Sequence, residues 1–322
     1  MKRDFVERIK ENDQVKGVFL VKEKVMATSK EGAPFLKVKL ADRTGEIEGR
    51  VWEGVEETSK LFKRGDFIFI EAQAVTFQDR LQLRIITLEP YPLEEVDLED
   101  FLPKSPRPPE ETLEELRRIA LKIREPFLFR LVFSFLEDGD FLRPFIKAPA
   151  SRRLHHARIG GLLEHTLSVV KLVERIRGHY EGVDWDLLLA GAILHDVGKV
   201  RELGEGLLFD YTDEGRLLGH ILLGLEMVQE KISSIPGFPE DLAMLIKHLI
   251  ASHHGQYEWG SPKRPKTLEA ELLHQLDNLD AKVTGIAEFI RRRGQEGEWT
   301  EYHRLFERFF YRGKEESLRE GP

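Results

Sequence analysis

The chain has 322 residues, a formal net charge of −8, 41% hydrophobic and 33% charged residues, and no cysteine. This composition is typical of a soluble protein with enough core for two domains, and the lack of thiols excludes both a disulfide framework and a thiolate zinc ribbon. No apolar run approaches the roughly 18 residues of a membrane span, and the N-terminus lacks the apolar region of a secretory signal. We therefore expect a cytoplasmic protein without a membrane partner.

The N-terminal part of the chain has a pattern of short strands separated by turn residues. Strand-like segments cover residues 15–27, 35–40, 47–52, 67–77 and 81–86, and a short helical stretch covers 55–62. Five strands with a helix between the third and the fourth is the element order of an OB fold. We predict an OB-fold-like, nucleic-acid-binding β-barrel over residues 1–92.

One face of this barrel is a candidate for binding single-stranded RNA. Side chains alternate along residues 35–40, so that the apolar Leu36, Val38 and Leu40 lie on one face and the remaining side chains on the other. On that other face we expect Phe35 and Trp52 to stack bases and Lys37 to contact phosphate. Further cations that could follow the phosphates are Lys39, Arg50, Arg80 and Arg84. The alternative is that this alternation serves cross-strand packing and solubility alone.

The net charge does not decide whether nucleic acid is a partner. A charge of −8 opposes phosphate binding, but residues 1–92 hold 17 Lys and Arg against 16 Asp and Glu, a balance of +1. A connector is predicted at residues 93–110, because residues 91–111 contain five prolines and seven acidic residues. From residue 111 the apolar residues recur with helical spacing. We predict an all-helical domain over 111–322 and a multidomain α+β fold for the whole chain.

The helical part is rich in histidine, the usual ligand of transition metals. The chain has 11 histidines, and ten of them lie between His155 and His274. The doublet His195-Asp196 ends an apolar run of helical type, and the other candidates also lie in segments with helical periodicity. The predicted metal ligands are His165, His195, Asp196, His220, His253, His254 and Asp277. Single histidines such as His179 and His274 are more simply explained as hydrogen-bonded core or surface residues.

Imidazoles with a few carboxylates favour first-row divalent ions over Mg²⁺ or Ca²⁺. We expect two ions, manganese before cobalt or iron, with Asp196 able to bridge them. Two ions about 3.5–4 Å apart stabilise both the attacking and the leaving oxygen of an in-line displacement at phosphorus. The residues by themselves therefore predict phosphoester hydrolysis. Asp280 shares a helix face with Asp277, so either carboxylate could complete the set.

The order of these residues, His…His-Asp…His…His-His…Asp, resembles the HD phosphohydrolase superfamily. The resemblance extends to a single family, the YhaM family of 3′–5′ exoribonucleases, on the stretches HHARIGGLLEHTLSVV, ILHDVGKVREL, YTDEGRLLGHI, ASHHGQYEWGSPKRP and ELLHQLDNLDAK. It covers nearly the whole chain, including the OB-like segment. It implies an OB-fold domain followed by an HD domain, release of nucleoside 5′-monophosphates from RNA 3′ ends, and Asp277 as the closing ligand with Asp280 behind it.

Several other residues are candidates for substrate contact. Lys199 follows the doublet closely and could stabilise charge on the phosphate as a catalytic residue. A basic group precedes the first ligand helix and could bind the phosphates of a 3′-terminal nucleotide. Its members are Arg152, Arg153, His155, His156 and Arg158. A solvated basic turn is the alternative. Tyr211, Tyr257 and Trp259 could stack a base or simply pack.

Two other functions remain open at this level. An HD enzyme of free or cyclic nucleotides would use the same ligands but would not need the barrel. A non-catalytic RNA-binding module would not need the complete ligand set. Single-stranded RNA is the expected partner, with single-stranded DNA as a second candidate. A homo-oligomer is possible, but the sequence does not show one.

Overall fold

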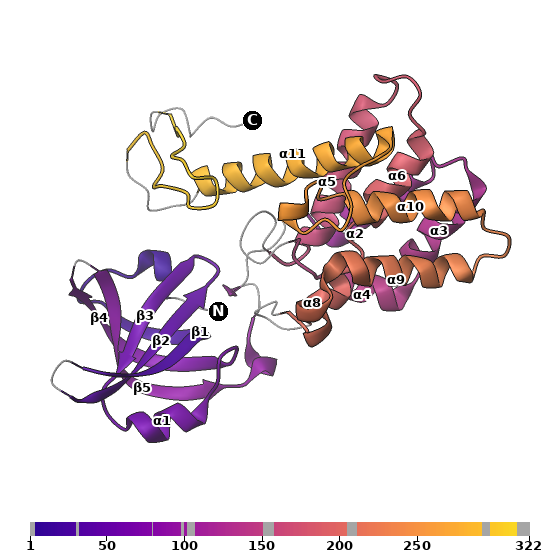
Figure 1. Cartoon of the computed structure of the whole chain (residues 1–322). Coiled ribbons are helices and arrows are strands. Elements are labelled where there is room, and N and C mark those ends of the chain that lie inside the picture. The colour runs from indigo at the N-terminus through magenta and orange to yellow at the C-terminus, as the bar shows by residue number, and fades with distance from the viewer. Residues whose placement is uncertain are drawn as a thin grey trace. The chain divides into compact units, whose positions relative to one another are not determined.

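The computed structural model describes residues 4–29, 32–78, 80–97, 100–101, 107–150, 158–204, 211–291 and 297–313. The described residues divide into two compact units, one within residues 4–101 and the other within residues 107–313 (Figure 1). The first unit consists of strands and the second of helices, which confirms the predicted multidomain α+β class. Among the described residues, no helix combines the length and the apolar character that crossing a membrane requires.

The first unit is a closed five-stranded barrel with the strand order β1-β2-β3-β5-β4. Its elements are β1 (Gln14–Thr28), β2 (Pro34–Asp42), β3 (Gly45–Val51), α1 (Val55–Leu61), β4 (Phe67–Phe77) and β5 (Arg80–Tyr91). Neighbouring strands are antiparallel except β3 and β5, which pair in parallel. With the helix between β3 and β4, this is the predicted OB-fold topology.

The strand faces also follow the predicted alternation. Leu36, Val38 and Leu40 are fully buried in the barrel core, while Phe35 and Lys37 lie on the outer face. One boundary differs from the prediction, because β5 continues five residues further than residue 86, to Tyr91. This extension includes Pro90 and alternates poorly, so it is held by pairing with β4 and not by its own pattern.

The predicted connector at 93–110 is not exposed throughout its described residues. Phe101 is 4% exposed and packs edge-on against Phe67, with 4.7 Å between ring centroids. A short 3₁₀ helix, η2 (Leu93–Glu95), precedes it, and the first long helix begins at Pro109. The compact barrel unit therefore continues past residue 92 because an aromatic side chain ties this segment to it.

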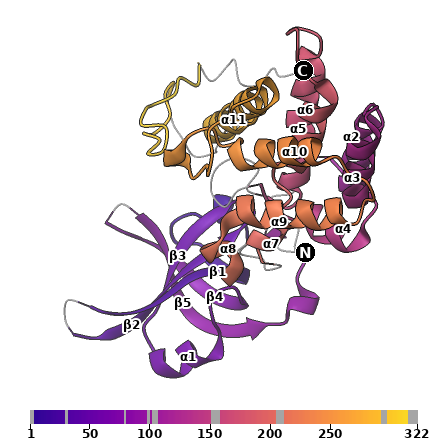
Figure 2. The ribbon, with the colours of Figure 1, turned by 45° about the vertical axis from the view of Figure 1, so that its right-hand side comes forward.

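The second unit is built from helices around one apolar core (Figures 1 and 2). They are α2 (Pro109–Ala120), α3 (Pro126–Leu136), α4 (Gly139–Phe145), α5 (Gly161–Ile176), α6 (Trp185–Leu194), α7 (Lys199–Glu202), α8 (Asp213–Leu217), α9 (Gly219–Ser233), α10 (Glu240–Ser252) and α11 (Leu268–Ile290). A 3₁₀ helix, η4 (Tyr257–Trp259), lies between α10 and α11.

Helix α6 is the centre of this unit. Every residue from Leu187 to Leu194 is buried, and α6 contacts α3, α5, α10 and α11. A helix that is apolar on all sides is stable only when it is surrounded in this way. Gly191 permits the close approach of α10, because a Cβ at this position would lie 2.4 Å from a methyl carbon of Leu249. The C-terminal end of α6, which carries His195, is therefore held in the protein interior.

The prediction of an all-helical domain up to residue 322 was wrong for its last described segment. Residues 297–313 form two isolated antiparallel bridges, Trp299 with Tyr311 and His303 with Arg308. Gly297 and Gly313 adopt positive φ angles at the ends of the segment. The aromatic and charged residues of this segment therefore belong to a hairpin-like arrangement and not to a helix.

Candidate metal centre

All seven predicted ligands meet in one region of the helical unit. His165 comes from α5, His195 and Asp196 follow the end of α6, and Asp277 lies in α11. His220 is the second residue of α9, and His253 and His254 follow α10. Five helices far apart in sequence therefore each deliver ligands to the same place.

The first group of possible ligands consists of His165, His195 and Asp277. The Nε2 atom of His165 lies 3.1 Å from Oδ1 of Asp277 and 3.2 Å from Nε2 of His195. Each residue offers one ligating atom, and these atoms all lie within 4.8 Å of one another. This spacing and the burial of both histidines fit the coordination sphere of a single cation.

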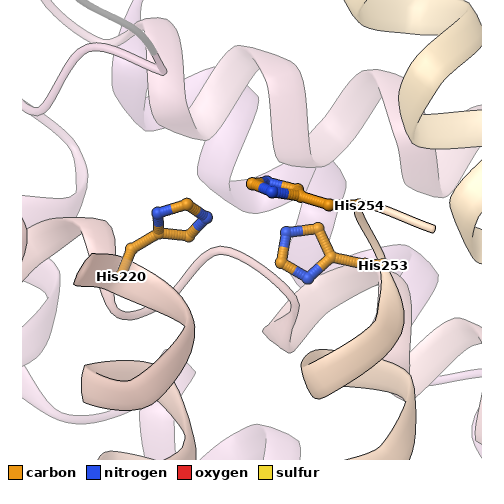
Figure 3. A group of neighbouring side chains, drawn as sticks. All are labelled: His220, His253 and His254. Atoms are coloured by element: carbon orange, nitrogen blue, oxygen red, sulfur yellow. The ribbon is translucent and has the colours of Figure 1, made fainter. Parts of the chain in front are cut away.

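The second group consists of His220, His253 and His254, whose rings approach one another in Figure 3. Ring centroids of His253 and His254 are 4.4 Å apart, and those of His220 and His254 are 5.1 Å apart. His253 is completely buried, whereas His220 and His254 are half-buried. The second group therefore has three residues, like the first, but it is more exposed to solvent.

Asp196 lies between the two groups. Its Oδ2 atom is 3.4 Å from Nε2 of His195 and 3.7 Å from Nε2 of His165. Its Oδ1 atom is 3.5 Å from Nε2 of His220 and 3.7 Å from Nε2 of His253. One carboxylate oxygen thus faces each group, which is the arrangement that a bridging ligand needs.

Three buried atoms test whether cations fit here. Oδ1 of Asp196, Nε2 of His220 and Nε2 of His253 are buried and have no hydrogen-bond partner among the described residues. Leaving a buried polar atom unsatisfied costs about 1–3 kcal/mol, so three such atoms at one point are unusual in a stable fold. All three atoms can donate a lone pair to a cation. The residues present therefore fit divalent first-row ions with nitrogen and oxygen ligands.

Backbone carbonyls fix the orientation of three ligand rings. The Nδ1 atoms of His195, His253 and His254 lie 2.9, 2.7 and 2.9 Å from the carbonyl oxygens of Ala192, Ile250 and Trp259, respectively. Because a carbonyl oxygen only accepts, each Nδ1 must carry the proton. The Nε2 lone pairs are then available for a metal ion.

Carboxylates fix the other two rings. Oδ2 of Asp280 lies 2.7 Å from Nδ1 of His165, and the hydroxyl of Ser168 donates to the other oxygen of Asp280. Asp280 therefore lies behind His165 and not among the ligating atoms. On the opposite side, Oε1 of Glu202 lies 3.1 Å from Nδ1 of His220 and accepts from the backbone N–H of the same residue at 3.0 Å.

Glu202 is a supporting residue for which the sequence predicted no role, whereas His274, expected to be a hydrogen-bonded core or surface residue, is buried and hydrogen-bonded. The ring of His274 donates from Nδ1 to the carbonyl of His253 at 2.8 Å and leaves no room for a side chain at Gly255. A Cβ at Gly255 would lie 2.3 Å from this ring, and Gly255 has a φ angle of +76°. The position of Glu202, six residues after Asp196, is the only sequence signal for its role, and it is a weak one.

Gly198 brings the turn after α6 directly against α9. A Cβ at Gly198 would lie 2.0 Å from the backbone oxygen of His220 and 2.5 Å from the backbone nitrogen of Gly224. Both obstacles are backbone atoms, so they could move only if α9 moved. Gly198 therefore allows the His195-Asp196 doublet and His220 to be as close as they are.

The charges in the centre keep Asp196 ionised and His253 neutral, whereas His165 must release a proton before its Nε2 atom can bind a metal ion. Burial tends to raise the pKa of Asp196, but Lys199, whose Nζ lies 2.6 Å from Oδ2, and His195 hold that pKa well below its usual range. Burial also lowers the pKa of His253 well below its ordinary value, which keeps its ring neutral. For His165, hydrogen bonds to Asp277 and Asp280 outweigh burial and raise the pKa to about 9.

Only some of the other residues predicted to contact substrate in this unit belong to the described part of the chain. Arg152, Arg153, His155 and His156 lie outside the described residues. Arg158 is described, and its guanidinium forms ion pairs with Glu164 and Glu288, both at 2.7 Å. Its geometry is that of a residue bracing the start of α5 against α11. Tyr257 and Trp259 are 60% and 51% exposed beside His254, and Tyr211 is 39% exposed.

On the barrel, the predicted residues form a cluster of rings and cations. Phe35 and Trp52 stack with 4.8 Å between centroids, and the guanidinium of Arg50 lies 5.4 Å from the Phe35 ring. Trp52 is 41% exposed, so one face of the stack is open to solvent. Lys37 and Arg50 share an ion pair with Glu48. Lys39 pairs with Glu46, while Arg80 and Arg84 are exposed.

Comparison with known proteins matches both parts of this architecture. The family model of the HD domain matches residues 162–282, which include the described ligands. Three relatives carry the name 3′–5′ exoribonuclease YhaM. The protein of Shouchella clausii is 35% identical to this chain, and the alignment covers 90% of each protein. The protein of Oceanobacillus iheyensis is 34% identical, and the alignment covers 93% of this chain and 94% of the relative. The protein of Halalkalibacterium halodurans is 33% identical, and the alignment covers 93% of each protein. With this identity over nearly the full length of both chains, the protein belongs to the YhaM family of 3′–5′ exoribonucleases.

Proposed function

We propose that this protein is a metal-dependent phosphodiesterase that removes nucleotides from the 3′ end of single-stranded RNA and releases nucleoside 5′-monophosphates. The observation that carries this proposal is the pair of three-ligand groups joined by the buried carboxylate of Asp196. The similarity to named exoribonucleases along the full chain supports RNA as substrate and the 3′ end as the starting point. Single-stranded DNA is a second substrate of the same class. An RNA substrate also leads us to place the protein in the cytoplasm.

The residues divide into two coordination sets. His165, His195, Asp196 and Asp277 would hold one ion, and Asp196 with His220, His253 and His254 would hold the other. Manganese is the ion that we propose first, with cobalt or iron as alternatives, because the donors are imidazoles and carboxylates. When bound, two such ions supply positive charge to the attacking and leaving oxygens of a phosphodiester.

The other residues prepare the centre for this charge. Lys199 is fixed by its ion pair with Asp196 and adds a further positive charge next to the reacting phosphate as a catalytic residue. Asp280 and Glu202 hold His165 and His220 in the orientation that points Nε2 at the centre. Burial of Asp196 and His253 excludes water from the side of the centre away from the substrate.

Substrate binding would use exposed rings and cations. In the helical unit, Tyr257 and Trp259 lie in the loop that holds His254 and offer stacking surfaces for a terminal base. Arg152, Arg153, His155 and His156 would bind nearby phosphates, whereas Arg158 would first have to exchange its two glutamates for phosphate. On the barrel, the stacked Phe35 and Trp52 with Lys37 would bind further along the strand.

The test compares a linear RNA labelled at its 5′ end with a circular RNA of the same sequence. With manganese present, the linear strand should shorten stepwise and release nucleoside 5′-monophosphates, while the circle should survive. Asp196→Asn is the matched control, because it keeps the side-chain shape and removes the charge. Rapid cleavage of the circle would show an endonuclease. Hydrolysis of free or cyclic nucleotides without RNA shortening would show the other class of HD enzyme, and RNA binding without hydrolysis would show a binding module.

A further inference from the structure

Helix α11 has an apolar stripe that begins in the core and continues beyond it onto an exposed part of the helix. The stripe follows a strict alternation of four and three residues, through Leu272, Leu276, Leu279, Val283, Ile286 and Ile290. Its first part is partly or fully buried against the bundle, but Leu279 is 48% exposed and Val283 is 57% exposed. A repeat of seven residues with two apolar positions is the seam of a coiled coil, which is stable only when another helix packs on it.

The exposed half of this stripe is accessible. Helix α11 contacts α5, α6 and α10, and its C-terminal half extends beyond these helices in Figure 1. The residues of α11 that are buried after Asp280 are Gly285 and Phe289. Phe289 packs against His303 and Phe310, with 4.3 and 6.3 Å between ring centroids. In the part of the chain that the structure describes, the side of α11 that carries Val283 is exposed to solvent.

Residues 297–313, which we call the C-terminal hairpin, add to this surface next to the end of the helix. Through Phe289 the hairpin is attached beside the stripe, because consecutive residues on a helix are about 100° apart and Phe289 directly precedes Ile290. Its exposed apolar residues, each about half exposed, are Trp299, Tyr302, Leu305, Phe309 and Tyr311. A soluble monomer rarely exposes so many large apolar side chains in one short segment.

We infer that this surface, made by the stripe and the C-terminal hairpin, binds a second copy of the same chain. The first reason is periodicity, since a heptad seam needs a partner helix with the same repeat, and α11 itself provides one under twofold symmetry. The second reason is charge. The hairpin contains three arginines and three glutamates, so two copies can pair opposite charges, whereas the phosphates of RNA would meet as many anions as cations.

The available area is sufficient for a stable pair. An aromatic side chain can bury 150–250 Å², so half-exposed rings and aliphatic side chains of this surface together offer on the order of 700 Å². Stable interfaces bury about 600–1,000 Å² on each partner, so this area lies within their range. This inference concerns a surface outside the metal centre and is independent of the proposed function.

The test is the molecular mass of the full-length protein in solution, measured by light scattering and sedimentation over a range of concentrations. The wild-type protein should have twice the chain mass of 37.3 kDa. Val283→Glu should raise the dimer dissociation constant at least about 100-fold, because it would bury two unpaired carboxylates in the seam. The control is Met244→Glu, an equally exposed position (59%) on α10, which should leave the mass unchanged.

A second measurement covers the case in which Val283→Glu does not fold. Because the chain has no cysteine, single substitutions to cysteine give unambiguous crosslinks. Leu279→Cys, Val283→Cys and Ile286→Cys should include at least one that forms a disulfide-linked dimer under mild oxidation, and Met244→Cys should form none. A wild-type protein that stays monomeric would overturn the inference, as would a dimer that persists in Val283→Glu without any crosslink along the stripe. A loss of RNA binding in Val283→Glu at constant mass would assign the surface to RNA instead.

Discussion

The barrel and the helical unit use charged side chains in opposite ways. On the barrel, cations such as Lys37 and Lys39 pair with neighbouring glutamates across β2 and β3 while remaining largely in water. In the helical unit, Asp196 is 2% exposed and is surrounded by histidines and Lys199. Exposed ion pairs contribute about 0–1 kcal/mol, whereas removing one member of a buried pair costs about 3–5 kcal/mol.

This difference indicates how each unit should respond to substitution. The barrel offers many weak and separate contacts along a surface, so losing one contact leaves the others intact. In the metal centre, each ligand is held by a second residue and Asp196 faces both groups, so a single change propagates to several atoms. We therefore expect substitutions in the metal centre to change activity far more than substitutions on the barrel surface.

Asp196→Asn should have the largest effect. The neutral amide cannot supply the negative charge that faces both ligand groups, so we expect RNA hydrolysis to fall at least about 10³-fold and metal content to fall with it. Metal content by mass spectrometry and hydrolysis of a labelled RNA measure this effect, with circular dichroism to show that the helices remain. Activity within a few-fold of wild type would contradict a metal mechanism that depends on this residue.

Glu202→Gln should affect one half of the centre. It weakens the hold on His220 but leaves His165, His195 and Asp277 unchanged, so the affinity of the second ion should fall about 10–100-fold. Asp280→Asn should likewise lower the affinity of the first ion, because Asp280 holds the ring of His165. Titration with manganese resolves the two affinities, and Glu226→Gln, an exposed position on α9, is the control. Equal loss at both ions from either change would mean that the groups are not separable.

Metal removal should destabilise only the helical unit. A ligand at 100 times its dissociation constant stabilises the folded state by about 2.7 kcal/mol, which corresponds to a shift in Tm of about 5–10 °C for a unit of this size. Calorimetry with and without manganese should therefore move the transition of the helical unit and leave that of the barrel in place. The Asp196→Asn protein should show no such shift. A shift of both transitions would contradict the contrast between the units.

Trp52→Ala should have the smallest effect and should appear in binding alone. Loss of one stacking platform costs about 1–3 kcal/mol in affinity for a single strand, without a change in the rate at saturating RNA. Lys37→Ala should lower the salt dependence of binding by about one phosphate contact. Filter binding at several salt concentrations measures both, with the exposed Leu61→Ala as control. An unchanged affinity in both variants would place the RNA on another surface.

Local sequence patterns were enough to predict the buried face of a barrel strand and most of the metal ligands. Alternation along residues 35–40 was enough to predict which side chains of β2 face the barrel core, and ligand chemistry in helical segments selected five histidines and Asp196, whereas the family resemblance selected Asp277 over Asp280. Both signals are local. Strand and helix periodicity depend on neighbouring residues, and the run through α6 is apolar on every side because that helix is central.

The contacts that support the ligands join segments that are distant in sequence, so they can be seen only in the folded protein. Glu202 supports His220, His274 supports His253, and Gly198 allows the doublet to approach α9, yet none of these pairs is close in sequence. The extension of β5 and the hairpin-like form of residues 297–313 likewise depend on what packs against them. A hydrogen bond or a close contact between distant segments leaves no periodicity in either one, so it exists only after the helices have assembled around α6 and the strands have closed the barrel.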